Sequence, residues 1–250
     1  RSIVDQRRNL VLSLLTSEPD ISAEELALRL NVSAITVRRD LQYWEEQNRI
    51  TRFYGGARVV QSFYEAHSEL NEIEIRKNAI AKRAAEFVED GDTVFINTSS
   101  TALLILSYIK GKKINVITNN ANAVFIQKDF NINVILTGGE LREPKESMVG
   151  EFALNNLSRV SANKTFIGCS GISSKVGITT AVLAEVAINE LMLKQSTGMR
   201  FVLADSTKVG HNHSFVSNSL SRVDILITDT MVNPEECKAI EEKNVRVLKV

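Results

Sequence analysis

The sequence predicts an α/β protein in two parts, an N-terminal winged helix-turn-helix followed by a mainly parallel α/β domain. The first part is indicated by two short helical patterns with a tight connection between them, and by a hairpin pattern that follows over residues 49–60. The second part is indicated by short β-rich runs that alternate with helical stretches over residues 93–249. Such alternation is typical of a parallel sheet that helices cover on both faces.

The first part begins with apolar residues at helical spacing over residues 3–15, after which Pro19-Asp20 predicts a break. Ser22, with Glu25 three residues later, forms a capping-box pattern that predicts a second helix over residues 24–30. A tight connection then leads to a third helix. Two short helices joined in this way are typical of a helix-turn-helix.

The third helix, over residues 33–41, is the expected recognition helix. Ser33 is placed to cap it by accepting from the free N–H groups of the first turn. Arginines near a helix start suit the major groove of DNA, because Arg can bond a guanine edge in bidentate fashion. The apolar side chains spaced for burial are Ile35, Val37 and Leu41. Polar groups near the helix start come from Thr36, Arg38, Arg39 and Asp40.

The next segment predicts a wing. Residues 49–54 alternate as in a strand, Gly55-Gly56 is typical of a hairpin turn, and residues 57–60 can return as a second strand. We expect Arg52 on this wing to contact a DNA phosphate. The expected DNA-binding residues are Ser33, Thr36, Arg38, Arg39 and Arg52. A small helical domain that binds protein is the alternative.

The charge pattern favours a local DNA-binding surface. Residues 29–58 contain six arginines against three carboxylates and carry a net charge of +3, whereas the whole chain has 30 basic and 30 acidic residues. A neutral chain is no general binder of nucleic acid. Affinity for phosphates therefore has to come from local placement of the arginines.

Length and composition indicate the general class of protein. The chain has 250 residues with 44% hydrophobic and 24% charged residues, which is typical of a globular protein with more than one domain. No apolar run is long enough for a membrane helix, so we expect no membrane partner. Two cysteines that lie far apart in sequence, Cys169 and Cys237, do not make a disulfide framework, which favours the cytoplasm. His211-Asn212-His213 favours a polar loop over a metal site, and we expect no cofactor.

We expect residues 1–60 to form the DNA-binding domain, residues 61–75 to be a linker, and residues 76–250 to form an effector-sensing domain that begins with a helix near residues 76–89. A further helix is expected from Ala121. Strands are expected over residues 93–97, 114–118, 132–137, 164–168, 200–204, 224–228 and 245–249.

Polar or glycine-rich groups follow five of these strands. In an open parallel sheet, ligands lie beyond the carboxyl ends of the strands, so these groups predict a polar pocket. The groups are Thr98 to Thr101, Asn119-Asn120, Gly138-Gly139, Cys169-Ser170-Gly171 and Asp205 to Lys208.

The segment Thr98-Ser99-Ser100-Thr101 lies at a strand-to-helix junction. Free backbone N–H groups and the helix dipole favour an anion there, and the hydroxyls add donors, as in a phosphate cradle. Lys208 supplies a cation at the end of another strand, and Glu185 opens a helix from which it could accept from sugar hydroxyls. The alternatives are an ordinary N-cap at residues 98–101 and solvated surface charges at the other two positions.

The order and spacing of six motifs resemble the DeoR family of bacterial transcription regulators over nearly the whole chain. The resemblance implies a repressor of a carbohydrate operon that binds double-stranded operator DNA as a homo-oligomer and responds to a phosphorylated sugar or a related metabolite. The motifs are VSAITVRRDL at Val32–Leu41, RFYGGA at Arg52–Ala57, VITNN at Val116–Asn120, LTGGEL at Leu136–Leu141, FIGCSGI at Phe166–Ile172 and ADSTKVG at Ala204–Gly210.

The second domain is also similar to ribose-5-phosphate isomerase, which implies a shared fold. Residues 98–102 resemble the phosphate loop of that enzyme, residues 204–208 resemble its A-D-x-S-K segment, and Glu185 falls at its acid/base position. Its acidic D-G-A-D segment, however, is replaced by residues 168–171, and its lysine-glycine loop is reduced to residues 175–177. Isomerisation needs a base together with groups that stabilise the enediolate, so we expect a sensor and not an enzyme.

One departure from the family concerns hydroxyl recognition. Many members have an Asp at the end of the first sensor strand and a G-T-T step after it, whereas this chain has Asn97 and Ser99-Ser100-Thr101. Two alternatives remain, an isomerase-like enzyme with a DNA-binding head and a second domain that only oligomerises. The expected effector-binding residues are Asn97, Thr98, Ser99, Ser100, Thr101, Asn119, Gly138, Gly139, Glu185, Asp205 and Lys208.

Overall fold

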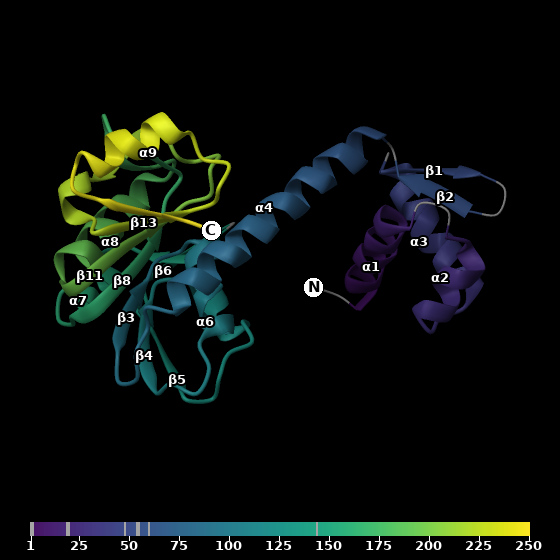
Figure 1. Cartoon of the computed structure of the whole chain (residues 1–250). Helices are drawn as coiled ribbons and strands as arrows, with labels where there is room; N and C mark the ends of the chain where they lie inside the picture. Colours follow the sequence, from purple (N-terminus) through teal and green to yellow (C-terminus); the bar gives the residue numbers. More distant parts are fainter. Residues whose placement is uncertain (1–2, 19–20, 48, 54–55, 60, 144) are drawn as a thin grey trace. The chain divides into compact units, whose positions relative to one another are not determined.

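The computed structural model describes residues 3–18, 21–47, 49–53, 56–59, 61–143 and 145–250, without the side chains of Ile3, Gln6 and residues 61–71. The chain forms two compact units, Arg1–Ile73 and Glu74–Val250. Figure 1 shows the elements of both units.

Unit 1 is a helix-turn-helix with a two-stranded wing (Figure 1), as the sequence predicts. The wing strands are antiparallel, with Ile50 opposite Val59 and Phe53 opposite Gly56. The expected break at Pro19-Asp20 and the first glycine of the expected hairpin turn lie outside the described residues. The elements are α1 (Ile3–Ser17), α2 (Ala23–Arg29), α3 (Ala34–Glu46), β1 (Ile50–Phe53) and β2 (Gly56–Val59).

Two serine caps set the start of the paired helices. Ser22 Oγ accepts from the backbone N–H of Glu25 at 3.1 Å, and Ser33 Oγ accepts from that of Thr36 at 3.2 Å. Between the helices, Asn31 has a φ of 52°, a left-handed conformation that asparagine tolerates better than most residues. The predicted caps are therefore confirmed. Helix α3 continues well beyond the expected end at residue 41.

The inner face of α3 combines apolar packing with a buried ion pair. Val37 and Leu41 are buried as expected, but Ile35 is 64% exposed, so its expected burial is wrong. Val37 and Leu41 fill the core from a different face of the helix than the one on which Ile35 lies. Asp40 is only 1% exposed, and its carboxylate pairs with the guanidinium groups of Arg7 at 2.6 Å and Arg8 at 3.3 Å. The ion pairs of Asp40 thus link α3 to α1.

Helix α4 (Gln61–Ala85) occupies the segment that was expected to be a linker. Residues 61–85 contain no glycine or proline and are rich in good helix formers, so one helix can run through the segment. The boundary between the two units falls inside this helix, after Ile73. The helix also ends earlier than the expected residue 89.

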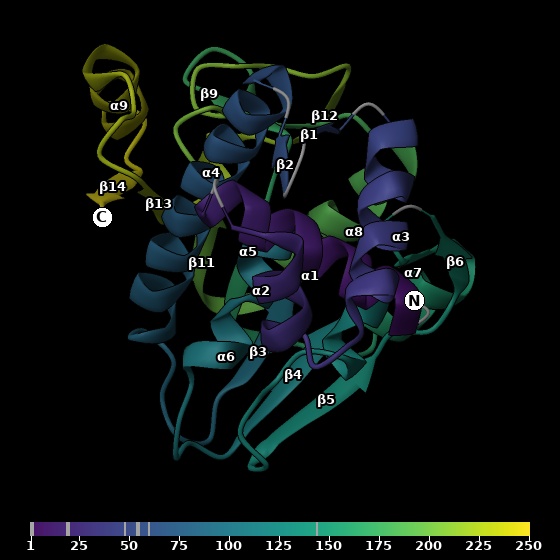
Figure 2. The ribbon, with the colours of Figure 1, turned by 90° about the vertical axis from the view of Figure 1, so that its right-hand side faces the viewer.

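Unit 2 contains a parallel seven-stranded sheet in the order β14-β13-β11-β8-β3-β4-β5, with β14 and β5 at opposite edges (Figure 2). All the expected strands are present, with ends shifted by a few residues. The strands are β3 (Thr93–Ile96), β4 (Ile114–Thr118), β5 (Ile132–Leu136), β8 (Ala162–Gly168), β11 (Ser196–Leu203), β13 (Ile225–Thr228) and β14 (Arg246–Lys249).

Helices cover both faces of this sheet (Figure 1), because successive strand side chains point to opposite faces. Val94 and Ile96 pack in the core with α4, α5 and α6, while Phe95 packs on the other face with α7 and α8. Helix α9 packs on that second face as well. These helices are α5 (Ser100–Leu103), α6 (Ile105–Tyr108), α7 (Glu151–Leu157), α8 (Leu183–Lys194) and α9 (Pro234–Glu241).

Short elements that the sequence analysis did not predict complete unit 2. The helix expected from Ala121 is a single 3-10 turn, η1 (Ala121–Val124), and a second such turn is η2 (Leu220–Arg222). Two small antiparallel sheets are separate from the main one, the hairpin β6-β7 and a three-stranded sheet in the order β12-β10-β9. Their strands are β6 (Glu140–Arg142), β7 (Ser147–Val149), β9 (Gly171–Ser173), β10 (Gly177–Thr180) and β12 (Phe215–Asn218).

The strand order reverses between β3 and β8. From β3 the chain moves outward through β4 to β5, and from β8 it moves the other way through β11 and β13 to β14. Parallel sheets of this kind bind ligands beyond the carboxyl ends of the strands at the point of reversal, because the flanking loops diverge there and leave a crevice. The topology therefore predicts a ligand site at the residues that follow β3 and β8.

A buried ion pair lies at the amino ends of the central strands β3 and β8, away from the reversal-point crevice at their carboxyl ends. Lys164 Nζ lies 2.8 Å from Asp92 Oδ2 and 2.7 Å from Glu89 Oε2. Burial opposes ionisation of Asp92, but hydrogen bonds from the Glu89 amide and the Lys164 ammonium hold the pKa of Asp92 below its ordinary value. Although burial lowers it, the pKa of Lys164 is raised overall because Asp92 and Glu89 stabilise the ammonium.

Within the described part of the chain, no helix has both the length and the apolar character needed to cross a membrane. The same residues hold no group of three or more His, Cys, Asp or Glu side chains arranged for a metal ion.

Candidate effector cavity and DNA-facing helix

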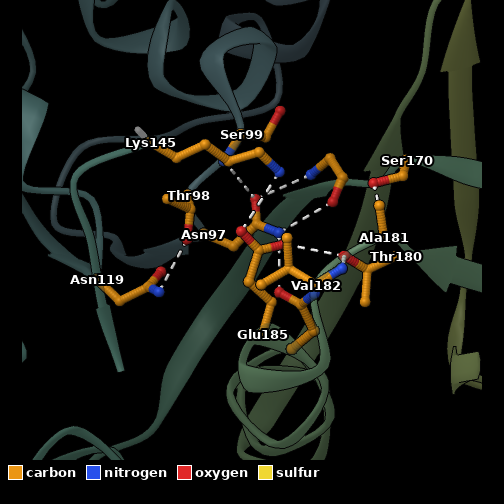
Figure 3. Close-up of polar contacts among 12 residues, drawn as sticks. Asn97, Thr98, Ser99, Asn119, Lys145, Ser170, Thr180, Ala181, Val182 and Glu185 are labelled. Carbon is orange, nitrogen blue, oxygen red and sulfur yellow. Dashed lines mark hydrogen bonds and ion pairs between the residues drawn. The ribbon is translucent and has the colours of Figure 1, made fainter. Parts of the chain in front are cut away.

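A cavity of about 670 Å³ lies at the reversal point of the sheet. Its walls come from the segments after β3 and β8, the loop between β6 and β7, and the first half of α8. Figure 3 shows the polar contacts among the residues that line it or support its wall. Of the expected effector residues, six line the cavity: Asn97, Thr98, Ser99, Ser100, Glu185 and Lys208.

The side chain of Asn97 joins the ends of β3 and β8 at the base of this cavity. Its Nδ2 donates to Gly168 O at 2.9 Å and to Asn189 Oδ1 at 2.8 Å. Its Oδ1 accepts from the N–H groups of Gly168 at 3.0 Å and Ser99 at 3.2 Å. Both amide hydrogens are therefore used inside the protein, and Asn97 positions the cavity wall before any ligand arrives.

Ser99 lies directly against Gly168, where no other residue fits. A Cβ at position 168 would lie 1.9 Å from Ser99 Oγ, so only glycine lets the two loops approach this closely. The same hydroxyl accepts from the N–H of Ala102 at 3.3 Å and caps α5. The N–H groups of Ser100 and Thr101, at the first two positions of that helix, have no intrahelical acceptors. Of the two residues, Ser100 lines the cavity, so its N–H group is available to an anion there.

Glu185 supplies a carboxylate inside the cavity. The residue is 6% exposed and lies in the first turn of α8. One oxygen accepts from the hydroxyl of Thr180 at 2.9 Å, and the other lies 3.4 Å from the ammonium of Lys145 (Figure 3). A carboxylate has about four lone-pair sites, so this one can accept further hydrogen bonds from a ligand.

Asn189 places a donor one helical turn beyond this carboxylate. Positions four apart on a helix share a face, so Asn189 and Glu185 both line the cavity. The Oδ1 atom of Asn189 accepts from Asn97, which fixes the orientation of the amide. Among the described residues, no acceptor bonds its Nδ2. An acceptor and a donor thus lie side by side in the wall, which suits a pair of hydroxyl groups.

Lys208 brings a cation to the other side of the cavity. Its Nζ lies 3.3 Å from Oδ2 of the buried Asp205. Burial opposes ionisation of Asp205, but the hydroxyl of Thr207 and the charge of Lys208 hold the pKa of Asp205 below its ordinary value. Burial raises the pKa of the Cys169 thiol to about 12. Burial thus disfavours the thiolate, which is the reactive form of a cysteine.

The remaining expected effector residues do not line the cavity. Asn119 is buried, and its Nδ2 donates to Thr98 Oγ1 at 2.9 Å and to Met148 O at 3.1 Å, which orients the Thr98 hydroxyl. Gly139 has a φ of 111°, and a Cβ there would lie 2.4 Å from the carbonyl oxygen of Val149. These residues shape the loops rather than line the cavity. They are Thr101, Asn119, Gly138, Gly139 and Asp205.

Sequence reasoning missed several lining residues. Asn189 carried a usable signal, since it follows Glu185 by one helical turn. Thr180 and Lys145 carried none, because one belongs to the unpredicted strand β10 and the other to the loop of the unpredicted β6–β7 hairpin. The other missed polar residues of the lining are Glu74, Asn122 and Glu146. Asn120, Cys169 and Ser170 also line the cavity and belong to the polar groups that were expected to follow the strands.

In unit 1, the outer face of α3 carries the arginines that the sequence singles out. Arg38 Nη2 pairs with Glu24 Oε1 of α2 at 3.0 Å, and both side chains are more than half exposed. Arg39 is exposed and has no ion-pair or hydrogen-bond partner among the residues that the structure describes. Arg52 in the wing lies 3.6 Å from the carboxylate of Glu45.

Ser33 and Thr36 serve the helix start. Their hydroxyls are hydrogen-bonded to each other at 2.8 Å, and Ser33 is the N-cap of α3. This arrangement fixes the direction in which the first turn of α3 leaves the protein surface.

Comparison with known proteins places both units. Residues 7–63 match the family described as DeoR-like helix-turn-helix domain, and residues 73–230 match the DeoR C terminal sensor domain. The chain is 32% identical to the uncharacterized HTH-type transcriptional regulator YulB of Bacillus subtilis, over 99% of this chain and 97% of the relative. It is 31% identical to the transcriptional repressor GlcR of the same species, over 98% and 95% of the two chains. The glycerol-3-phosphate regulon repressor of Escherichia coli is 32% identical, over 90% of each chain.

Solved structures show more distant similarity. Ribose 5-phosphate isomerase A of Methanocaldococcus jannaschii matches at 16% identity and a TM-score of 0.38, over 53% of this chain and 52% of that chain. The match therefore spans about half of the isomerase. The translation initiation factor eIF-2B of Pyrococcus horikoshii matches at 15% identity and a TM-score of 0.41, over 82% of this chain and 72% of the other.

Proposed function

Because the chain belongs to the DeoR family of helix-turn-helix transcriptional regulators, we propose that unit 1 binds operator DNA as a repressor and that a phosphorylated sugar in the cavity of unit 2 releases it. Its curated relatives are named as transcriptional regulators and repressors, which decides against an isomerase with a DNA-binding head. The observation that carries the effector proposal is the cavity at the reversal point, whose lining contains both anion donors and a carboxylate.

The DNA-binding proposal rests on the outer face of α3. Residues near the start of a recognition helix reach base edges in the major groove, and Arg38 and Arg39 both lie on the exposed side of this helix. The buried ion pair of Asp40 with α1 holds that side outward. Arg52, on the wing, is placed to contact a phosphate without reading sequence.

The phosphate proposal rests on the segment after β3. The free N–H group of Ser100 and the hydroxyls of Ser99 and Ser100 provide donors, and Lys208 provides a positive charge in the lining of the same cavity. A neutral sugar would leave this charge without a ligand partner. The phosphate of a phosphorylated sugar or polyol can accept from these donors and pair with the charge of Lys208. The naming of an Escherichia coli relative for the glycerol-3-phosphate regulon supports this ligand class.

The hydroxyl proposal rests on α8. Glu185 can accept from hydroxyls and the free amide hydrogens of Asn189 can donate to them, so the pair suits neighbouring hydroxyls of a sugar. The Asn97 amide has no hydrogen left to donate, so its expected contact with the effector is replaced by a positioning role.

We further propose that the protein acts as a homo-oligomer. One recognition helix covers few base pairs, and two heads on repeated half-sites gain affinity through their link. Light scattering on the full chain at micromolar concentration, with and without DNA, tests this. Only monomer under both conditions would contradict it.

The effector proposal is tested by calorimetry on the full chain with matched sugars. The probes are glycerol 3-phosphate, glucose 6-phosphate, fructose 6-phosphate and ribose 5-phosphate, each beside its unphosphorylated form. We expect at least one phosphorylated probe to bind and its unphosphorylated partner to bind more weakly. Preference for unphosphorylated forms would contradict the phosphate site. No binding by any probe would favour a second unit that only oligomerises.

A further inference from the structure

The exposure of Ile35 is unexplained by the packing of unit 1. The side chain is 64% exposed, while Val37 and Leu41 on the same helix fill the core. A single exposed apolar residue is ordinary on a protein surface, so exposure alone decides nothing. Its position is what distinguishes it.

Ile35 lies on the same face of α3 as the two arginines. It is the second residue of the helix, and Arg38 and Arg39 follow it by three and four positions, so the three side chains are neighbours. Gln42, one further turn along, is exposed on this face as well. The face thus combines an apolar group at its N-terminal end with cationic and amide groups behind it.

This combination matches a specific feature of the major groove. Guanine presents two acceptors there, which suit Arg, while thymine is the base that presents a methyl group, which suits an apolar side chain. The charge of the arginines complements the phosphates on either side of the groove. A surface that binds another protein through Ile35 would have to cover this charged helix start as well.

We propose that Ile35 contacts the C5-methyl group of a thymine, next to the base pair that Arg38 or Arg39 reads. The proposal rests on the proposed DNA-binding function and adds to it one specified base. It also explains why the N-terminal turn of α3 tolerates a β-branched apolar residue on its open side, where helix propensity favours other residues.

The test uses DNA recovered by in vitro selection from a random duplex library with the full-length protein. Each thymine of the recovered half-site is then replaced singly by deoxyuridine, which removes only the methyl group. Affinities are measured by fluorescence anisotropy for the wild type, for Ile35→Ala and for the control Leu10→Ala. Leu10 is 51% exposed on α1, so the control removes an exposed apolar side chain outside α3.

We expect one thymine in the half-site whose replacement weakens wild-type binding about fourfold, the factor that follows from burying one methyl group. Ile35→Ala should bind the thymine duplex more weakly by a similar factor and lose sensitivity to that replacement. Leu10→Ala should retain both the affinity and the sensitivity of the wild type.

Two results would overturn the inference while leaving DNA binding intact. One is a recovered site at which no thymine replacement matters, and the other is equal sensitivity in Ile35→Ala and the wild type. Failure of the selection to enrich any sequence would instead overturn the DNA-binding function, and the thymine contact with it. Thermal unfolding of Ile35→Ala at the wild-type temperature establishes that a loss of affinity reflects the contact.

Discussion

The side-chain amide of Asn97 bonds both backbone groups of Gly168, with its Nδ2 2.9 Å from the carbonyl oxygen and its Oδ1 3.0 Å from the nitrogen. Asn97 directly follows β3 and Gly168 ends β8, the two neighbouring strands on either side of the reversal point. Backbone polarity therefore fixes which side-chain atom is nitrogen and which is oxygen. An aspartate at position 97 could accept from Gly168 but could not donate to it.

Asn97→Asp should destabilise unit 2 by about 1–3 kcal/mol, because a carboxylate would leave the Gly168 carbonyl and Asn189 Oδ1 without their donor. Urea denaturation at pH 7 measures the change. The matched control is Asn115→Asp, on the exposed part of β4, where the oxygen accepts from Asn133 and a carboxylate can accept too. Equal stability of the two variants would contradict the positioning role of Asn97.

Lys208→Met should weaken binding of the phosphorylated probe by about 1.5–3 kcal/mol, because it removes a charge-assisted contact. Binding of the unphosphorylated sugar should change much less, which separates loss of a phosphate contact from general damage. Calorimetry with both ligands measures this. Lys243→Met, which neutralises an exposed lysine outside the cavity, is the control. Unchanged affinity for the phosphorylated probe in Lys208→Met would refute the phosphate site.

Arg39→Ala should weaken binding to the selected DNA by about 1–3 kcal/mol if Arg39 reads a base. Arg38→Ala should cost less than Arg39→Ala, since Arg38 has to leave its ion pair with Glu24 before it reaches DNA. For the same reason, Glu24→Gln should tighten DNA binding, because it removes a negative charge beside the groove.

These three variants are compared by gel shift on the selected duplex and on a scrambled one. If a double variant with alanine at Arg38 and Arg39 binds the selected duplex as tightly as the wild type does, α3 is ruled out as the recognition helix. The control is Arg29→Ala. Arg29 is the last residue of α2, is exposed, and pairs with Glu18 and Glu25.

The buried pair of Asp92 and Lys164 predicts a pH dependence of stability. The folded pKa of Asp92 is lowered, so its contribution is present above the unfolded pKa near 4 and is lost as pH falls through the lower folded value. In Asp92→Asn, the free energy of unfolding should be lower at pH 7 and should fall less steeply between pH 5 and pH 3. Urea titrations at several pH values measure both slopes. If the free energy of unfolding falls equally steeply with pH in the wild type and in Asp92→Asn, the lowered pKa of Asp92 is contradicted.

The sequence predicted the helix-turn-helix, its two serine caps and the parallel strands because their signals are local. A cap needs only a serine and the next turn, and a buried strand needs only a short apolar run. The linker prediction differed from the structure for a related reason. Residues 61–75 are polar, which resembles a linker, but polarity without glycine or proline is equally compatible with a helix.

The cavity was predicted in outline and missed in detail. The residues after β3 and the acidic side chain of Glu185 were found, since strand ends and helix starts are visible in sequence. Lys145 was missed because a loop brings it to Glu185 across forty residues of chain. The role of Asn97 was also out of reach, because it depends on where Gly168 lies in space and not on its own neighbours.

The most direct test of the central claim measures the coupling between the two ligands. Fluorescence anisotropy gives the Kd of the wild-type protein for the selected duplex, with and without a saturating concentration of the phosphorylated sugar found by calorimetry. We predict that the sugar weakens DNA binding about tenfold or more, and that saturating DNA weakens sugar binding by the same factor, as linkage requires. In Glu185→Gln, DNA binding should persist and release should need more sugar. An unchanged Kd for DNA at saturating sugar would contradict the account.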